Sequence, residues 1–220
     1  MEITRFGQSA VLVEDGETRI LLDPGTLSGD AVFEIDRLDA LLITHEHQDH
    51  VDPDRIGALL AANPAAPVHA PAAVLELIGL AGDPRGRIAV AGAPFSIGSI
   101  GIEPVGELHQ VILPSMPRCT NVGFVLTGAD GVRVFHPGDS YETVPAGIDL
   151  LALPLLGPWN SLRETVEFAS AVAAPRVFPI HDVHLSGTGF ALFWSLITQS
   201  AAPGVACLDV EQGVSFSTTP

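Results

Sequence analysis

The run Thr44-His45-Glu46-His47-Gln48-Asp49-His50 is the most informative stretch of this chain. It follows the apolar residues Leu41-Leu42-Ile43, which predict a buried strand over residues 38–44. Its first two histidines are two residues apart, so on extended backbone both imidazoles lie on one side. Four ligand-type side chains within six residues can converge only where a positive charge offsets the cost of burying them. The run therefore predicts a metal site. The alternative, a solvated polar loop, fits poorly directly after an apolar strand.

Composition favours one soluble domain over residues 1–220. Hydrophobic residues make up 47% of the 220 residues and charged ones 16%, which is ample for a core. The formal net charge is −16, and all ten basic residues are Arg, without a cluster. Such a surface repels nucleic acid and anionic lipid, so we expect neither as a partner. Cys119 and Cys207 match no zinc spacing and are expected to be reduced thiols.

The N-terminal residues show no apolar segment of the signal-peptide kind, and no apolar run approaches the length of a membrane span. We therefore expect a cytoplasmic protein. Its oligomeric state stays open, and a homo-oligomer is compatible with the sequence.

Strand and helix patterns alternate in two blocks. Asp15-Gly16 predicts a hairpin between strands over residues 10–13 and 19–23. A capping box from Ser161 to Glu164 predicts a helix that runs to about residue 173. The other predicted strands cover residues 68–70, 121–126, 132–136, 150–154 and 176–180, and the other predicted helices cover residues 53–62, 72–80 and 188–200. This order suggests two similar halves packed sheet on sheet with helices outside.

Further motifs follow later predicted strands. They are His109 in Glu107-Leu108-His109, Asp139 in His136-Pro137-Gly138-Asp139-Ser140, and His181 in Phe178-Pro179-Ile180-His181; Asp23 in Leu21-Leu22-Asp23-Pro24-Gly25 precedes them all. With these motifs and its His-x-His-x-Asp-His run, the chain resembles the metallo-β-lactamase superfamily over essentially its whole length. The resemblance implies an α/β fold, a four-layer αββα sandwich.

The resemblance also implies two metal sites. His45, His47 and His109 would hold one ion, Asp49, His50 and His181 the second, and Asp139 would bridge them. All donors are N or O, so Zn is the default, and Mn or Fe fits the same set. His47, in place of the Glu of the redox di-iron branch, favours hydrolysis. His184 competes with His181 as the last ligand. We expect Asp23 to hold the ligands in place by hydrogen bonds without binding metal itself. His136 is expected either to do the same or to serve only in packing.

Two divalent ions sharing one water lower its pKa from about 15.7 to near 7. The expected reaction is attack of this metal-bridging hydroxide on a carbonyl carbon or a phosphorus, with Asp49 orienting it. His184 is a candidate for proton transfer or substrate contact. Trp159, Asn160 and Arg118 are candidate substrate contacts, although Trp159 fits a core position equally well. His69 is expected to be structural.

The segment from Gly123 to Asp139 looks like the branch of small metal-dependent hydrolases that includes ascorbate-6-phosphate lactonase-like proteins. We therefore predict an enzyme that hydrolyses an ester, lactone or phosphoester bond in a small molecule. One alternative is a phosphodiesterase similar to ribonuclease Z, acting on nucleic acid. The other is a metal-binding sensing module without turnover, although all seven ligand positions are filled.

Overall fold

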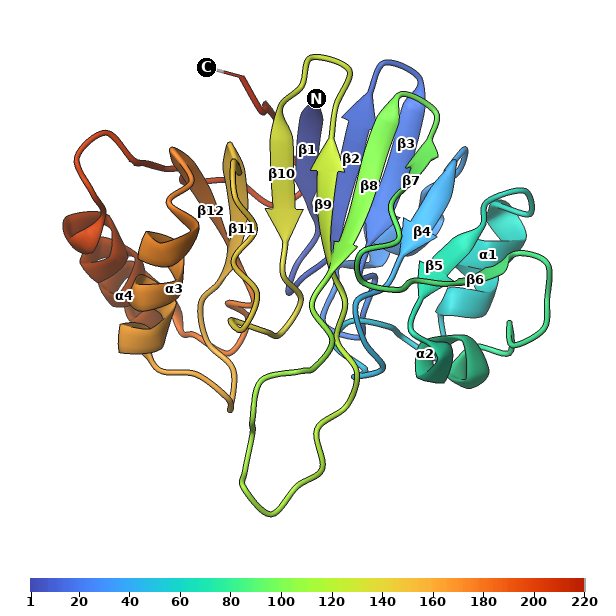
Figure 1. The fold of residues 1–220 in the computed structure, drawn as a ribbon, viewed down its shortest axis with the longest axis horizontal. Coiled ribbons are helices and arrows are strands. Elements are labelled where there is room, and N and C mark those ends of the chain that lie inside the picture. The colour runs from blue at the N-terminus through green and yellow to red at the C-terminus, as the bar shows by residue number, and fades with distance from the viewer. Residues whose placement is uncertain (220) are drawn as a thin grey trace.

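The computed structural model describes residues 1–219, whose strands form two seven-stranded mixed sheets (Figure 1). The N-terminal sheet has the order β14-β1-β2-β3-β4-β5-β6 and the C-terminal sheet the order β13-β12-β11-β10-β9-β8-β7. The strands of the N-terminal sheet are β1 (Glu2–Arg5), β2 (Val11–Asp15), β3 (Thr18–Leu22), β4 (Ala40–Leu42), β5 (Val68–Ala70), β6 (Gly86–Ile88) and β14 (Ser215–Ser217). The strands of the C-terminal sheet are β7 (Phe95–Ile97), β8 (Ile100–Val105), β9 (Gly123–Thr127), β10 (Arg133–His136), β11 (Leu150–Pro154), β12 (Arg176–Ile180) and β13 (Ala206–Cys207).

The helices cover the outer faces of the two sheets. On the N-terminal sheet lie the 3-10 helix η1 (Asp30–Glu34) and helices α1 (Ile56–Ala62) and α2 (Ala72–Leu77), and on the C-terminal sheet lie α3 (Leu162–Val172) and α4 (Gly187–Ser200). Figure 1 shows the two helix groups on opposite sides of the molecule. Among residues 1–219, no helix is both long enough and apolar enough to cross a membrane.

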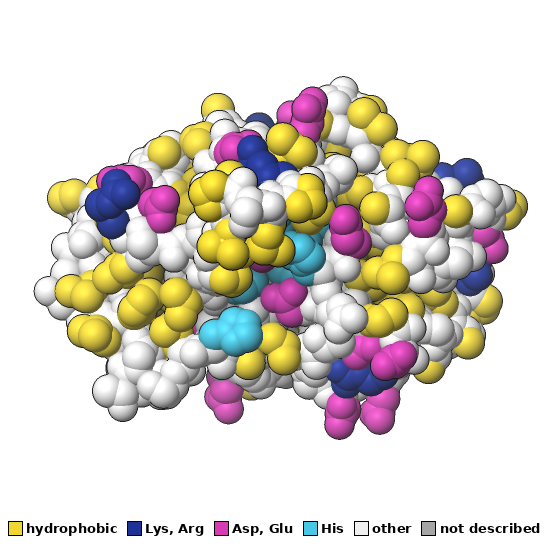
Figure 2. Space-filling view, turned by 90° about the horizontal axis from the view of Figure 1, so that it is seen from below, with side chains coloured by type: hydrophobic (Ala, Val, Ile, Leu, Met, Phe, Trp, Pro, Cys, Tyr) yellow, Lys and Arg dark blue, Asp and Glu magenta, His cyan; other side chains and the backbone are white. Residues whose placement is uncertain are grey.

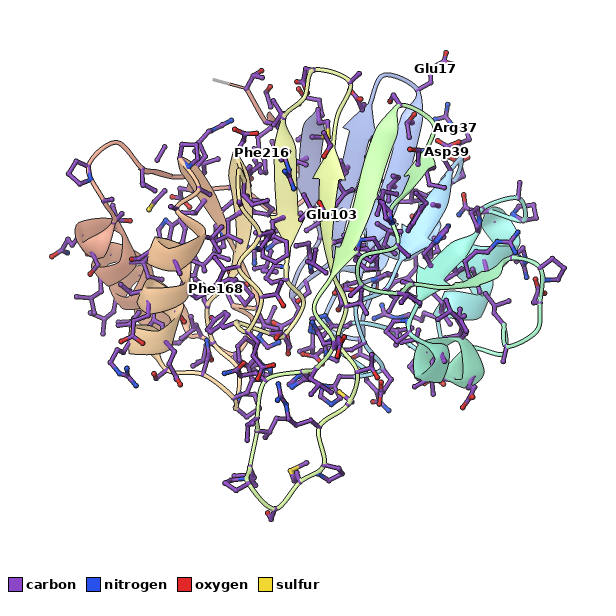
Figure 3. The ribbon with its side chains drawn as sticks, viewed as in Figure 1. Glu17, Arg37, Asp39, Glu103, Phe168 and Phe216 are labelled. Carbon is purple, nitrogen blue, oxygen red and sulfur yellow. The ribbon has the colours of Figure 1, made fainter. Side chains whose placement is uncertain are left out.

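Three apolar layers hold these four layers of structure together. One core lies between the sheets and includes Leu42 and Phe178, which is within 5.3 Å of Phe216 between ring centroids. A second core lies under η1, α1 and α2, and a third, with Phe168 of α3, lies under α3 and α4. Figure 3 labels Phe168, which belongs to the core under α3 and α4, and Phe216, which packs against the core between the sheets. The predicted αββα sandwich is therefore confirmed.

Helix boundaries differ from the predicted ones where other hydrogen bonds replace those of the helix. The helix predicted from residue 53 begins at Ile56, because the carboxylate of Asp52 first accepts the backbone N–H groups of Asp54 and Arg55 at 2.9 and 3.0 Å. The helix predicted to reach residue 80 ends at Leu77, where the chain turns and the N–H of Leu80 bonds to the carbonyl of Leu75 at 2.8 Å. The capping box at Ser161 and Glu164 is confirmed.

Strand direction places the candidate ligands at one end of the sandwich. β3 and β4 are parallel, as are β10, β11 and β12, so their carboxyl ends point the same way within each sheet. Asp23 follows β3, His45 follows β4, Asp139 follows β10 and His181 follows β12. This is the edge at which open α/β sheets bind ligands. Figure 3 labels Glu17, Arg37 and Asp39 near the opposite end of the molecule.

His69 belongs to neither group of candidate ligands and gives a prediction for stability. Its ring on β5 stacks on Phe95 of β7, 4.0 Å between centroids, and burial with nearby Arg87 lowers the pKa of His69 to about 4. The unfolded chain, with a histidine pKa of about 6.5, then binds more protons between these values. We expect the contribution of neutral, buried His69 to the free energy of unfolding to be complete above pH 6.5 and lost as the pH falls to 4. Urea unfolding at pH 6.5 and pH 4 should show that the free energy of unfolding falls less on acidification in His69→Phe than in the parent. An equal fall in both proteins would contradict a lowered pKa of His69 in the fold.

Candidate metal centre

The loop after β4 is tied down by the carboxylate of Asp23, which is completely buried. Asp23 accepts the backbone N–H of Thr44 at 2.8 Å and the Thr44 hydroxyl at 2.7 Å. It also lies 2.7 Å from Nδ1 of His50. The Thr44 oxygen lies 3.0 Å from Nδ1 of His45. With both Nδ1 atoms directed at these oxygens, the Nε2 atoms of His45 and His50 point toward the cleft, and Nε2 of His45 lies 3.1 Å from Nδ1 of His47.

The two later histidines are fixed in the same manner by backbone carbonyls. Nδ1 of His109 lies 2.6 Å from the carbonyl of Gln110, and Nδ1 of His181 lies 2.6 Å from the carbonyl of Leu156. His181 has a φ of +54°, in the left-handed region that only a few non-glycine residues adopt. This strained turn directs the ring of His181 back over the end of the sheet.

Asp139 lies where these rings converge. Its Oδ1 is 3.1 Å from Nε2 of His50, and its Oδ2 is 3.1 Å from Nε2 of His181 and 3.4 Å from Nε2 of His109. Two groups of donor atoms, each within 4.8 Å of one another, share this carboxylate: His45, His47, His109 and Asp139 in one, and Asp49, His50, Asp139 and His181 in the other. The structure thus brings together all seven predicted ligands.

These donor atoms fit divalent cations. Nε2 of His50, His109 and His181 and Oδ1 of Asp139 are buried, and although the nitrogens lie 3.1–3.4 Å from oxygens of Asp139, none of the four atoms makes a hydrogen bond of suitable geometry. Unpaired buried polar atoms are costly, so four facing one another require a common partner. Imidazole nitrogens and carboxylate oxygens are ligands of Zn and of related transition metals. The residues present therefore fit two ions with Asp139 between them.

The polypeptide alone balances this cluster only by taking up protons. Burial would lower the pKa of His50, but Asp139 and Asp23 raise it well above its ordinary value. Burial would likewise lower the pKa of His181, but Asp139 raises it to about 10. Burial would raise the pKa of Asp139, yet His181 and His50 hold it well below its usual range. Cations in the cluster would replace these protons, so metal uptake releases them.

The turn that carries Asp139 is closely packed. Gly138 has a φ of +61°, and a Cβ there would lie 2.4 Å from Oδ1 of Asn121 and 2.8 Å from Thr44, so only glycine fits. The N–H of Gly138 donates to Nδ1 of His136 at 3.2 Å, and Nε2 of His136 donates to the carbonyl of Ser9 at 2.9 Å. His136 therefore supports the Asp139 turn and bonds no ligand side chain directly.

Trp159 contacts the bridging position from the opposite side. Its indole N–H donates to Oδ2 of Asp139 at 2.8 Å, and its side chain is buried. A Cβ on Gly157 would lie 2.3 Å from the indole nitrogen, so glycine makes room for the ring. The side-chain oxygen of Asn160 accepts the N–H of Gly157 at 2.7 Å, and its amide nitrogen donates to the carbonyl of Leu155 and to the hydroxyl groups of Tyr141 and of Thr165 on α3. Asn160 therefore holds this loop, which differs from the predicted substrate contact.

A cavity of about 330 Å³ opens on the ligand cluster. Its lining includes Asp49, Ile112, Trp159, His181 and His184. In the space-filling view, histidine and acidic side chains lie in a hollow bordered by hydrophobic ones (Figure 2). Another cavity, of about 360 Å³, lies between α3 and α4 among apolar side chains, away from the ligands.

Arg118 does not line this cavity among the described residues. Its Nε donates to the carbonyl of His109 at 2.5 Å, and its guanidinium pairs with Glu142 at 2.6 Å. The guanidinium therefore braces the His109 segment, in place of the predicted contact with an anionic group. His184 lies at the mouth, its ring 6.2 Å from that of His181.

Comparison with known proteins agrees with this geometry. A family profile described as "Beta-lactamase superfamily domain" matches residues 2–181. The chain belongs to the metallo-β-lactamase superfamily. It is 35% identical to protein Rv0786c of Mycobacterium tuberculosis, over 98% of this chain and 100% of that protein. It is 30% identical to a UPF0173 metal-dependent hydrolase of Nitratidesulfovibrio vulgaris, over 81% of this chain and 79% of the relative, which places it in the UPF0173 metal-dependent hydrolase family. The metallo-β-lactamase fold protein YhfI of Bacillus subtilis shares the fold, with a TM-score of 0.76, 17% identity and coverage of 98% of both chains.

Two residues of this metallo-β-lactamase site escaped the sequence analysis. Gln8 is completely buried; its amide donates to Oδ2 of Asp49 at 3.2 Å, and its side-chain oxygen accepts the N–H of Val183 at 3.1 Å. Cys119 places its sulfur 3.8 Å from Nε2 of His47. Neither the glutamine nor the cysteine belongs to a recognisable sequence motif. Their place at the site is therefore evident only from the three-dimensional structure.

The Trp159 bond predicts a loss of metal affinity in a variant that keeps the ring. Trp159→Phe removes the N–H donated to the Asp139 carboxylate, and a hydrogen bond to a charged group contributes about 1.5–3 kcal/mol. We expect metal to bind about 10- to 100-fold more weakly, measured by competition with a chromophoric chelator. The matched control is Trp194→Phe, because Trp194 lies in the core under α4. Equal affinities in the two variants would refute a positioning role for the indole.

Proposed function

We propose that this chain is a dinuclear hydrolase that cleaves an ester, lactone or phosphoester bond in a small molecule. The observation that carries the proposal is the set of buried, unpaired atoms of His50, His109, His181 and Asp139 that face one another beside an open cavity. When bound, two divalent ions supply a water of lowered pKa and polarise the electrophile. Zn suits this nitrogen and oxygen donor set, and Mn is the second choice.

Side chains around the donor groups would orient the attacking water and transfer protons. Oδ2 of Asp49 is 3.2 Å from Nε2 of His181 and 3.2 Å from the Gln8 amide, and its side chain faces the cavity. Although burial would raise the pKa of Asp49, His181 and His50 lower it, so its carboxylate stays ionised and can accept a hydrogen bond that orients the attacking water. The exposed ring of His184 lies at the mouth, where it exchanges protons with solvent and the leaving group.

A small-molecule substrate is favoured over nucleic acid. The cavity of about 330 Å³ is of the size that holds small ligands. The formal charge of −16 opposes the approach of a polyanion. The negative charge therefore disfavours the ribonuclease Z-like alternative, whose substrate would be a polyanion.

The test is a substrate panel assayed on protein reconstituted with Zn or with Mn. It contains bis-p-nitrophenyl phosphate, lactones, thioesters and nitrocefin, and each assay is repeated after chelation. We expect hydrolysis of at least one lactone or ester that chelation abolishes and metal restores. Protein that holds its metal ions but hydrolyses none of these would contradict the proposal and favour a sensing module.

A further inference from the structure

The loop between β8 and β9, residues 106–122, stands out from the end of the sandwich that carries the metal centre (Figure 1). Its base is fixed there: the N–H of His109 bonds to the carbonyl of Cys119 at 3.0 Å, and the N–H of Gln110 bonds to the carbonyl of Asp139 at 2.8 Å. Ile112, three residues after the predicted ligand His109, lines the cavity. The position of this loop is therefore tied to the site itself.

The part of the loop beyond Ile112 exposes large apolar side chains. Leu113 is 53% exposed and Met116 49%, and Val111 and Leu108 nearby are exposed as well. These side chains flank Ile112 along the loop, and a cluster of exposed apolar side chains is typical of a ligand-binding surface. Figure 2 shows hydrophobic side chains beside the histidine and acidic groups of the hollow. On its other side, the cavity is lined by the side chains of Leu27, Pro158 and Trp159.

No arginine or lysine side chain is found among the described residues that line the cavity. Phosphate sites are commonly built from Arg, Lys or free helix N-termini. The sequence holds no Lys, and none of its arginines is among the described residues that line the cavity. Arg118, the arginine of this loop, is already paired with Glu142. A phosphoester would therefore depend on the ions alone for its charge and would otherwise meet apolar walls and carboxylates, whereas an uncharged acyl group would find a matching surface.

We propose that the cavity takes an uncharged ester or lactone, in preference to a phosphoester, whose apolar acyl portion packs against Ile112 and Trp159 in the cavity and, when long, extends along the loop toward Leu113 and Met116. This inference rests on the proposed hydrolase function and narrows its substrate class. This substrate differs from the phosphorylated lactone that a resemblance to ascorbate-6-phosphate lactonase-like proteins would imply. In the reaction, the oxygen of water forms a bond to the carbonyl carbon, the acyl C–O bond breaks, and the leaving alkoxide takes a proton from that water.

The experiment compares p-nitrophenyl acetate, butyrate and octanoate with p-nitrophenyl phosphate and bis-p-nitrophenyl phosphate, on the full chain reconstituted with Zn. Each buried methylene contributes enough transfer free energy for about a fourfold change, so partial burial predicts about a two- to fourfold rise in kcat/KM per methylene. We expect the octanoate to be the best substrate and both phosphates to be poor ones. A flat chain-length series, or a faster phosphoester, would overturn the inference while leaving the hydrolase proposal intact. If every compound is inert although metal is bound, the hydrolase proposal fails and this inference fails with it.

Two variants of the loop test whether its side chains cause the rise of kcat/KM with acyl chain length. The readout is the ratio of kcat/KM for octanoate to that for acetate, which a general loss of activity does not change. Ile112→Ser, and separately Leu113→Ser combined with Met116→Ser, should each lower this ratio about tenfold. The control is Leu192→Ser on α4, where Leu192 is 58% exposed, and it should keep the parental ratio. Equal ratios in the loop variants and the control would overturn the assignment.

Discussion

Replacing Asp139 with Ala is expected to leave room for at most one of the two ions and to lower kcat/KM by about a thousandfold or more. Stabilisation of transition-state charge by metal ions contributes several kcal/mol, and each 1.36 kcal/mol changes the rate tenfold. Asp139 is the carboxylate common to both donor groups, so no other side chain of either group replaces it. Its loss also leaves the facing atoms of His50 and His181 without their counter-charge.

The measurement is metal content by elemental analysis alongside turnover of the best substrate of the panel. Asp54→Ala is the matched control, since the carboxylate of Asp54 is exposed on the turn before α1. Circular dichroism should show that the Asp139→Ala protein keeps its secondary structure, because a turn rather than a strand or helix carries this residue. Parental turnover with two bound ions would exclude a bridging role for Asp139.

Replacing Asp23 with Ala is expected to be the most destabilising single change near the site. The substitution leaves a backbone N–H, a hydroxyl and an imidazole N–H of Thr44 and His50 without their acceptor. Each unsatisfied buried group costs about 1–3 kcal/mol, so we expect the free energy of unfolding to fall by about 3–5 kcal/mol. His50 also loses the partner that fixes its tautomer, which should weaken metal binding about 10- to 100-fold.

Urea unfolding of the chelated protein separates these two effects, since metal then contributes nothing to stability. The full loss of about 3–5 kcal/mol should persist after chelation. Asp54→Ala again serves as the control, with an expected change within about 0.5 kcal/mol. A parental unfolding midpoint for chelated Asp23→Ala would show that the three hydrogen bonds contribute nothing to the fold.

Most of the ligand set was predictable because the ligands follow strands or lie in a dense local pattern, whereas His109, four residues after β8, was assigned from the resemblance to the superfamily. The run from His45 to His50 follows β4, and the His181 motif follows β12. Parallel strands bring such positions to one edge, so order along the chain translates into proximity. The αββα layering was predictable for the same reason, since the alternation of strand and helix patterns is set by local hydrophobicity.

Residues whose roles depend on loop geometry were not predictable. Asn160 and Arg118 are polar residues near the site, and composition alone suggests that they face a substrate. The structure instead uses both for internal hydrogen bonds. Trp159 illustrates the converse, because its buried ring was compatible with plain packing, and only the turn at Gly157 places its N–H on Asp139.

The most direct test of the account is the metal content of the reconstituted protein. The chain should be purified, stripped with chelator, dialysed against excess Zn or Mn and measured by elemental analysis, with unbound metal removed. The shared carboxylate and the two donor groups predict two ions per chain, and at most one in Asp139→Ala. Fewer than one ion per chain after reconstitution, with either metal, would contradict the account.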